Sequence, residues 1–214
     1  MRLRKVKNAF EKLSENSNIV ILEPEKLKGN WKSLFHNDNE IRLEIGCGKG
    51  QFIVGMAKAF PNINFIAMEK FDSVLLRAME RLLAEKDLPS NLKLVLGDAA
   101  MLNEYFLKSE ISNIYLNFSD PWPKAKHAKR RLTSPIFLGL YKEILPATGK
   151  IIQKTDNHDL FYYSLDMYKE NGFHIDKISY DLHKEDWFNI TTEFEDKWSK
   201  LGPIYFVEVS IIHE

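Results

Sequence analysis

The chain has 214 residues, 44% of them hydrophobic, and its 30 Lys and Arg balance its 30 Asp and Glu. This length suits one α/β domain with short extensions, and no apolar run is long enough to cross a bilayer. The single cysteine, Cys47, excludes an internal disulfide, so a reducing cytoplasm is the simplest location, and we interpret it as a small packing residue.

The first forty residues are expected to form a basic arm and an irregular lead-in. The cations of residues 1–12 are Arg2, Arg4, Lys5, Lys7 and Lys12. No apolar segment accompanies them, so this stretch is not a secretory signal. It is either a frayed terminus or an arm that becomes ordered on phosphate. In residues 13–39 we expect Trp31 and Phe35 to cover the core.

From residue 41 onward, strand-like and helix-like patterns alternate. The expected strands are residues 41–45, 65–68, 92–96, 114–116, 150–154, 173–182 and 204–212. The expected helices are residues 51–60, 71–87, 99–108, 133–145 and 160–170, and residues 183–203 are expected to form an acidic loop. This alternation predicts an α/β fold: a doubly wound, mostly parallel, seven-stranded sheet with an antiparallel edge hairpin. We therefore expect a single domain over residues 41–214, preceded by the arm and lead-in of residues 1–40.

Acidic residues stand at the ends of three successive predicted strands. Glu44 lies just before the glycine turn that begins at Gly46, Glu69 closes the second strand, and Asp98 follows the third. The turn has the spacing G-x-G-x-G rather than G-x-G-x-x-G, and a dinucleotide pyrophosphate does not favour a carboxylate beside it. S-adenosylmethionine carries an ammonium, a ribose diol and an adenine amine. The three acids complement these groups.

The segment 117–131, N-F-S-D-P-W-P-K-A-K-H-A-K-R-R, follows the fourth predicted strand. Its two prolines exclude a helix and favour extended backbone at Asp120 and Trp122, the residues that precede them. Five cations come next: Lys124, Lys126, Lys129, Arg130 and Arg131. Taken alone, the segment is equally typical of a polar turn before a solvated basic helix. In an open α/β sheet, however, ligands bind at this edge of the strands.

Several motifs together resemble those of the bacterial tRNA (guanine-N7-)-methyltransferase family. They are E-I-G-C-G-K-G at 44–50, M-E at 68–69, G-D at 97–98, F-S-D-P-W-P-K-x-K-H-x-K-R-R-L at 118–132, K-T-D-N at 154–157 and T-E-F-E at 192–195. The glycine turn is shared by many methyltransferases, whereas S-D-P-W-P-K is far more specific. Two positions depart from the pattern: Phe194 stands where tyrosine is common, and Gln153 where an aromatic residue is common.

The resemblance implies a Rossmann-like class I methyltransferase of the cytoplasm. Its activity would be transfer of a methyl group from S-adenosyl-L-methionine to N7 of a guanine in the variable loop of tRNA, with S-adenosyl-L-homocysteine as product. Asp120 is then the catalytic residue. The residues implied to bind the methyl donor are Glu44, Gly46, Glu69, Asp98 and Asp120. Those implied to bind the tRNA substrate are Lys124, Asp156, Thr192, Glu193, Phe194 and Glu195. Those implied to contact RNA are Lys126, His127, Ala128, Lys129, Arg130 and Arg131.

The chemistry of guanine N7 agrees with this assignment. Its lone pair is free, so no proton has to be removed, and the methylated ring is cationic. A carboxylate at Asp120 stabilises that developing charge, and the remaining catalytic work is alignment of the reactants. The Watson–Crick edge presents two adjacent donors, for which Asp156, Glu193 and Glu195 are the candidate acceptors. We expect tRNA as partner, no membrane and no metal, and a monomer or homodimer.

Three other functions are compatible with parts of the sequence. A methyltransferase for a small molecule does not need the cations of residues 124–131. A nicotinamide-dependent oxidoreductase is disfavoured by the glycine spacing and by Glu44. A non-enzymatic RNA-binding protein on the same fold does not need intact donor-site acids or Asp120.

Overall fold

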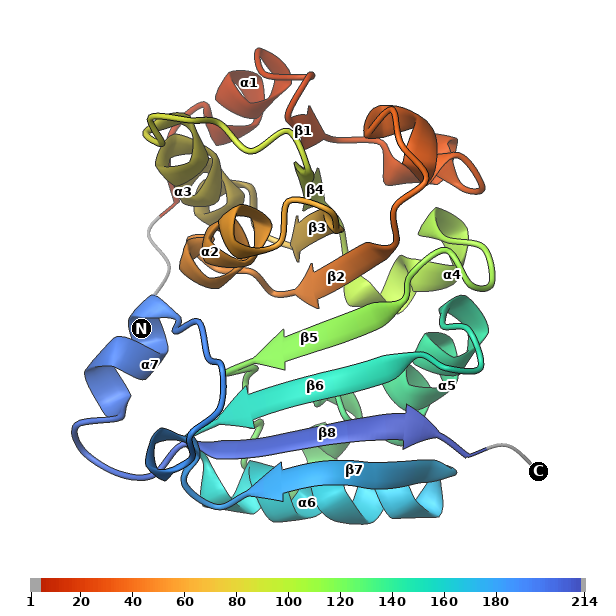
Figure 1. The fold of residues 1–214 in the computed structure, drawn as a ribbon, viewed down its shortest axis with the longest axis vertical. Coiled ribbons are helices and arrows are strands. Elements are labelled where there is room, and N and C mark those ends of the chain that lie inside the picture. The colour runs from red at the N-terminus through yellow and green to blue at the C-terminus, as the bar shows by residue number, and fades with distance from the viewer. Residues whose placement is uncertain (1–4, 213–214) are drawn as a thin grey trace.

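The computed structural model describes residues 5–212, and its centre is one sheet with strand order β1-β4-β3-β2-β5-β6-β8-β7 (Figure 1). The strands are β1 (Val20–Ile21), β2 (Ile41–Ile45), β3 (Asn64–Glu69), β4 (Leu92–Leu96), β5 (Asn113–Asn117), β6 (Lys150–Thr155), β7 (Phe173–Ser179) and β8 (Tyr205–Ile211). Neighbouring strands from β1 to β6 are parallel, and β8 is antiparallel to both β6 and β7. The predicted mostly parallel sheet with an antiparallel edge hairpin is confirmed.

Helices cover both faces of the sheet (Figure 1). They are α1 (Ala9–Ser14), α2 (Gln51–Ala59), α3 (Asp72–Leu83), α4 (Leu102–Tyr105), α5 (Pro135–Ile144), α6 (His158–Glu170) and α7 (Glu193–Trp198). Side chains alternate along β3: Phe65 and Ala67 join the core beneath α1, α2 and α3, whereas Ile66 and Met68 join the core beneath α4, α5 and α6. The fold is therefore doubly wound, as predicted.

The sheet has eight strands rather than the predicted seven, because the lead-in supplies β1. Val20 and Ile21 pair with Leu94 and Val95 of β4, at the edge of the sheet. Two residues are too few for a periodic pattern, which is why this strand could not be predicted. Residues 1–4 of the basic arm, with Arg2 and Arg4, lie outside the described residues.

The described part of the arm and the rest of the lead-in pack against the domain. α1 contacts α3, and the amide of Val6 donates to Ser73 Oγ at 2.9 Å. Trp31 and Phe35 are buried, as expected for residues that cover the core, and Trp31 stacks on Phe106 with ring centroids 5.0 Å apart.

The segment expected to be a loop, residues 183–203, contains α7. Thr192 caps this helix, since its Oγ1 accepts a hydrogen bond from the amide of Glu195 at 2.9 Å. The sequence carried this signal, a threonine followed by acids in the first turn. The helix was not predicted because the acidic composition of the segment is typical of a loop.

Candidate active site

The carboxyl ends of the parallel strands bring the predicted donor-site acids to one edge of the sheet. Glu44 is in register with Ala67 of β3 and Tyr115 of β5, and Glu69 closes β3 next to Leu96 of β4. The glycine turn after β2 is tied to this edge, because the amide of Gly48 donates to Glu69 at 3.3 Å. The acids are thus neighbours in space, as their strand-end positions predicted.

The glycine turn has an open side. Gly46 and Gly48 have φ of +74° and +57°, a region that other residues rarely adopt, and a Cβ at either position would meet nothing within 4 Å. The bare backbone is therefore accessible to a ligand. Cys47, between them, is buried, and burial raises the pKa of its thiol well above the usual range, which suits the packing role assigned to it.

Glu44 is a buried carboxylate with one unpartnered oxygen. Its side chain is 1% exposed; Oε1 accepts a hydrogen bond from Asn117 Nδ2 at 2.8 Å, whereas Oε2 has no partner within the described residues. Burial raises the pKa of Glu44 to about 7, although Asn117 and the charge of Lys154 oppose the rise. A buried acceptor without a donor fits the ammonium group of S-adenosylmethionine.

The other two donor-site acids are already held by the chain. Glu69 Oε1 accepts from the amides of Lys70 and Phe71 at 2.8 and 3.1 Å, and burial raises its pKa, helped by the nearby charge of Asp120. Asp98 accepts from Lys70 Nζ at 2.6 Å and from the amide of Ala100 at 3.1 Å. Burial alone would raise the pKa of Asp98, but these bonds lower it. Both carboxylates are fixed in position before a ligand arrives.

Asp120 is exposed beside these acids and has no hydrogen bond or ion pair within residues 5–212. The backbone around it is strained: Phe118 and Trp122 have φ of +51° and +42°. The extended geometry predicted for Trp122 is therefore wrong. Bulky residues adopt such angles only where surrounding contacts enforce them, and they gather at functional sites.

Arg131 supplies such contacts at Trp122. Its Nε donates to the carbonyl of Pro121 at 2.9 Å and its Nη2 to that of Trp122 at 3.1 Å, while its guanidinium lies 4.2 Å from the ring centre of Tyr163. These bonds bend the backbone after Asp120. The resemblance implied that Arg131 contacts RNA, but in the structure its charged group faces the protein.

The remaining residues of the basic segment are differently placed. Arg130 lies 4.9 Å from the ring centre of Trp122, and the ring of His127 meets the same indole edge-on at 5.7 Å. Lys124, Lys126 and Lys129 are exposed and form no ion pair within the described part of the chain. These three lysines are available to an anionic partner.

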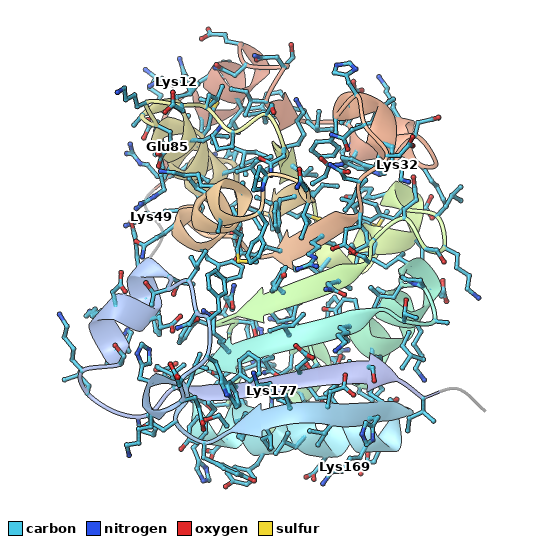
Figure 2. All side chains as sticks on the ribbon, in the orientation of Figure 1. Lys12, Lys32, Lys49, Glu85, Lys169 and Lys177 are labelled. Carbon is cyan, nitrogen blue, oxygen red and sulfur yellow. The ribbon has the colours of Figure 1, made fainter. Side chains whose placement is uncertain are left out.

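The segment Thr192–Glu195 lies against the Asp120 loop. Phe194 contacts Phe118, with ring centroids 5.1 Å apart. Lys49, labelled in Figure 2, reaches from the glycine turn toward α7, where its Nζ is 2.8 Å from Glu193, and Glu193 also pairs with Arg81. The structure thus brings two sequence-distant motifs, F-S-D-P and T-E-F-E, together.

The three acids considered for guanine recognition differ in access. Glu195 is fully buried, with both oxygens engaged by Lys154, Asn189 and His183. It cannot accept from a base without losing these bonds, so its geometry does not support that role. Asp156 is exposed, and Glu193 is partly exposed within its ion pairs. Recognition of the Watson–Crick edge by Asp156 or Glu193 stays a prediction.

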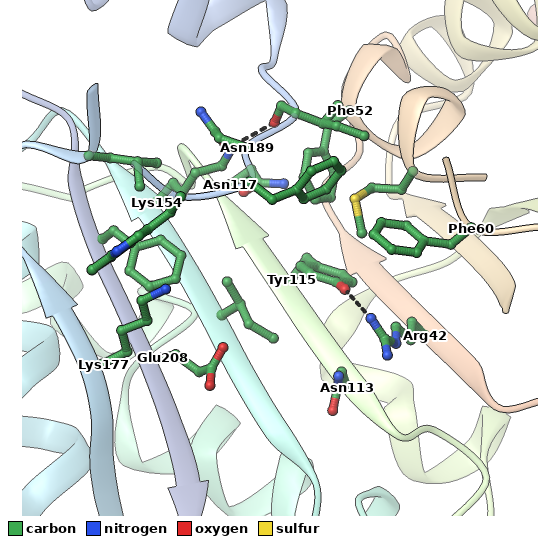
Figure 3. Close-up of a pocket in the computed structure, with 17 residues that line it drawn as sticks. Arg42, Phe52, Phe60, Asn113, Tyr115, Asn117, Lys154, Lys177, Asn189 and Glu208 are labelled. Atoms are coloured by element: carbon green, nitrogen blue, oxygen red, sulfur yellow. Dashed lines mark hydrogen bonds between the residues drawn. The ribbon is translucent and has the colours of Figure 1, made fainter. Parts of the chain in front are cut away.

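A pocket of about 220 Å³ lies on the sheet beside this site (Figure 3). Asn117 and Lys154 are at one end, with Phe52 of α2 and Asn189; Arg42 and Asn113 are at the other. Neither Asn117 nor Lys154 was predicted from the sequence as a site residue. Both residues do lie in motifs singled out in the sequence: Asn117 opens the segment 117–131, and Lys154 opens K-T-D-N.

Residues 5–212 contain neither a membrane-spanning helix nor a metal-binding cluster. None of the helices in this range combines the length and apolar character needed to cross a membrane. The same residues contain no cluster of three or more His, Cys, Asp or Glu side chains that could hold a metal ion.

The chain is similar to proteins of known class along nearly its whole length. A family model described as putative methyltransferase matches residues 38–207. A tRNA (guanine-N(7)-)-methyltransferase of Listeria monocytogenes serotype 4b (strain F2365) is 50% identical over 210 residues, 97% of each chain. One of Bacillus cytotoxicus is 51% identical over 210 residues, 97% of this chain and 96% of that protein.

Solved structures agree on the fold. An antibiotic-related methyltransferase superimposes with a TM-score of 0.64 at 16% identity, covering 86% of this chain and 94% of that one. The antibiotic-resistance methyltransferase Kmr superimposes with a TM-score of 0.57 at 16% identity, covering 87% and 93%. These superpositions confirm the fold predicted from the sequence. The chain is 50% and 51% identical to the Listeria and Bacillus enzymes over 97% of its length. It therefore belongs to the tRNA (guanine-N(7)-)-methyltransferase family.

Proposed function

We propose that this protein transfers a methyl group from S-adenosyl-L-methionine to N7 of a guanine in the variable loop of tRNA. The observation that carries the proposal is the juxtaposition of a buried carboxylate with a free oxygen, Glu44, and an exposed carboxylate, Asp120, at one sheet edge. The first suits the cationic donor. The second suits a base that becomes cationic.

Some residues of the site bind the methyl donor, and others act on the guanine. Glu44 Oε2, the open backbone at Gly46 and the carboxylates of Glu69 and Asp98 hold the methyl donor. When bound, the donor supplies an electrophilic methyl group on a sulfonium. Asp120 stabilises the positive charge that develops on the guanine, in a position fixed by the backbone bonds from Arg131. Since N7 carries no proton, none of these groups needs to act as a base.

The acceptor side has an electrostatic and a packing component. Lys124, Lys126 and Lys129 attract the phosphates of the RNA. Phe194, which is 43% exposed and packed on Phe118, offers an aromatic surface beside Asp120 for a base that has left its stack. Extrusion costs less from a flexible loop than from a stable duplex, which favours a guanine in a tRNA loop. The choice of the variable loop rests on the resemblance to the family. A small-molecule acceptor would leave the lysines unexplained.

Methylation of an unmodified tRNA transcript with methyl-labelled donor tests the proposal. Digestion and nucleoside analysis should find the label in 7-methylguanosine. Asp120→Ala should lose most of it, whereas Asp166→Ala, at an exposed acid on α6, should keep it. Label in another nucleoside, or no label with folded wild-type protein, would overturn the assignment.

A further inference from the structure

Lys154, near the end of β6, is a buried cation that takes no part in the chemistry proposed for the site. Its side chain is 3% exposed. Its Nζ donates to Asn189 Oδ1 at 3.1 Å, to the carbonyl of Ile190 at 2.9 Å and to Glu195 Oε2 at 2.6 Å. An ammonium has three donors, so Lys154 is fully used. All three acceptors belong to one segment, residues 189–195.

The acceptors of Lys154 are themselves interlocked. Glu195 is 0% exposed, and its second oxygen accepts from Asn189 Nδ2 at 2.7 Å and from His183 Nε2 at 3.1 Å. Burying such a pair brings little net stability, because both charges lose their hydration. A lysine here is better explained by the position that it imposes on residues 189–195.

The surroundings of Lys154 connect it to both halves of the site. Its ammonium lies 4.9 Å from the ring centre of Phe52, and Figure 3 shows it at the same end of the pocket as Asn117, the partner of Glu44. Two residues further along the chain is Asp156. The segment that Lys154 binds leads into Phe194, which packs on the Asp120 loop.

We propose that Lys154 is a positioning residue, which holds residues 189–195 against the end of β6 and so places Phe194 against Phe118 of the Asp120 loop. Glu195 then serves as its buried counter-ion rather than as a reader of the base. The catalytic part of this inference rests on the proposed function. The structural part, that Lys154 orders residues 189–195, does not.

Lys154→Met tests both parts, because it keeps an unbranched side chain of nearly the same length and removes its charge. We expect kcat/KM for tRNA, measured at saturating methyl donor, to fall about tenfold or more. Affinity for S-adenosylhomocysteine should fall less, and only through Glu44, whose pKa the charge of Lys154 holds down. Amide hydrogen exchange should accelerate in residues 189–198 and stay unchanged in β2 and β3. The control is Lys150→Met, a lysine on the same face of the same strand whose partners, Glu208 and Asp176, are partly exposed. It should alter none of these quantities.

A double-mutant cycle with Glu195→Gln isolates the pair. If the two residues act as one unit, the double variant should lose no more activity than the less active single variant. Additive losses, or unchanged exchange in residues 189–198, would overturn the proposal. If Lys154→Met does not fold, Glu195→Gln, which keeps the shape of its side chain, carries the same readouts. If wild-type protein does not methylate tRNA, the proposed function fails, and hydrogen exchange still decides the positioning role.

Discussion

At the scale of single residues, burial sets the properties of Glu44. Its pKa of about 7 means that the free protein holds this carboxyl largely protonated below neutral pH. The cationic donor needs the ionised form. Affinity should therefore fall as the pH falls through the pKa, and the fall reflects the shrinking ionised fraction.

Calorimetry with S-adenosylhomocysteine, which carries the same ammonium, measures this effect. Between about pH 7.5 and about pH 5.5 the affinity should drop about 25-fold, and Glu44→Gln should bind weakly with a flatter profile. An equal pH dependence in wild-type protein and Glu44→Gln would assign the titration to another group.

Asp120 should act on the chemical step rather than on binding. It is exposed and makes no bond that holds the fold within the described residues, so Asp120→Ala should leave stability and tRNA affinity almost unchanged. Removal of one preorganised electrostatic partner typically lowers the rate about 10²–10³-fold. Single-turnover methyl transfer at saturating tRNA measures the step. Equal losses in rate and in tRNA affinity would make Asp120 a binding residue.

Much of the residue-level site followed from the sequence, because acids at strand ends meet wherever strands are parallel. The contacts that individual side chains make could not be predicted from the sequence. Whether Glu195 faces a ligand or a buried lysine depends on the path of residues 183–195, and no periodicity constrains that path. Arg131 and Arg130 are adjacent in one cation cluster, yet only Arg131 donates to the loop carbonyls.

At the scale of elements, the basic segment separates into an outward and an inward part. Lys126 and Lys129 are exposed, whereas Arg131 holds the loop. Replacing both lysines with alanine should reduce the slope of log affinity against log salt by about 0.9 for each duplex phosphate that is no longer neutralised. Arg131→Ala should instead lower the methylation rate with little change in slope. Filter binding across a salt series distinguishes the two. Equal changes in slope would place Arg131 on the RNA.

The strands and helices of residues 41–170 were largely predictable from the sequence, whereas β1 and α7 were not. Strands such as Leu92–Leu96 and helices such as Asp72–Leu83 carry enough apolar residues for a period to emerge. β1 does not, and Trp122 was wrongly expected to be extended because tertiary bonds from Arg131 override the local preference before proline.

At the scale of the molecule, the lead-in is structurally continuous with the sheet. Leu13 of α1 is fully buried beneath α3, in the same core as β3 and β4. Leu13→Ala should therefore destabilise the protein by about 2–5 kcal/mol, as for other buried leucines. Urea unfolding measures it, with Phe10→Ala, at a half-exposed neighbour, as control. A destabilisation below about 0.5 kcal/mol would show that residues 41–214 fold independently of α1.

Although the net charge of the molecule is zero, its positive and negative charges lie in different places. Acids gather at the donor edge, and free lysines lie just beyond Asp120. This arrangement orients an RNA so that one base approaches the carboxylates while its phosphates stay on the lysines. A neutral chain can therefore bind a polyanion in one orientation.

The central claim is that this edge methylates guanine N7 within a tRNA. The most direct measurement is methyl transfer to a tRNA that carries 7-deazaguanosine, in which carbon replaces N7, at the target position. We predict that this tRNA binds as well as the unmodified one and accepts no methyl group at that position. Methylation of the deaza nucleoside at the wild-type rate would contradict the account, because the acceptor atom would then not be N7.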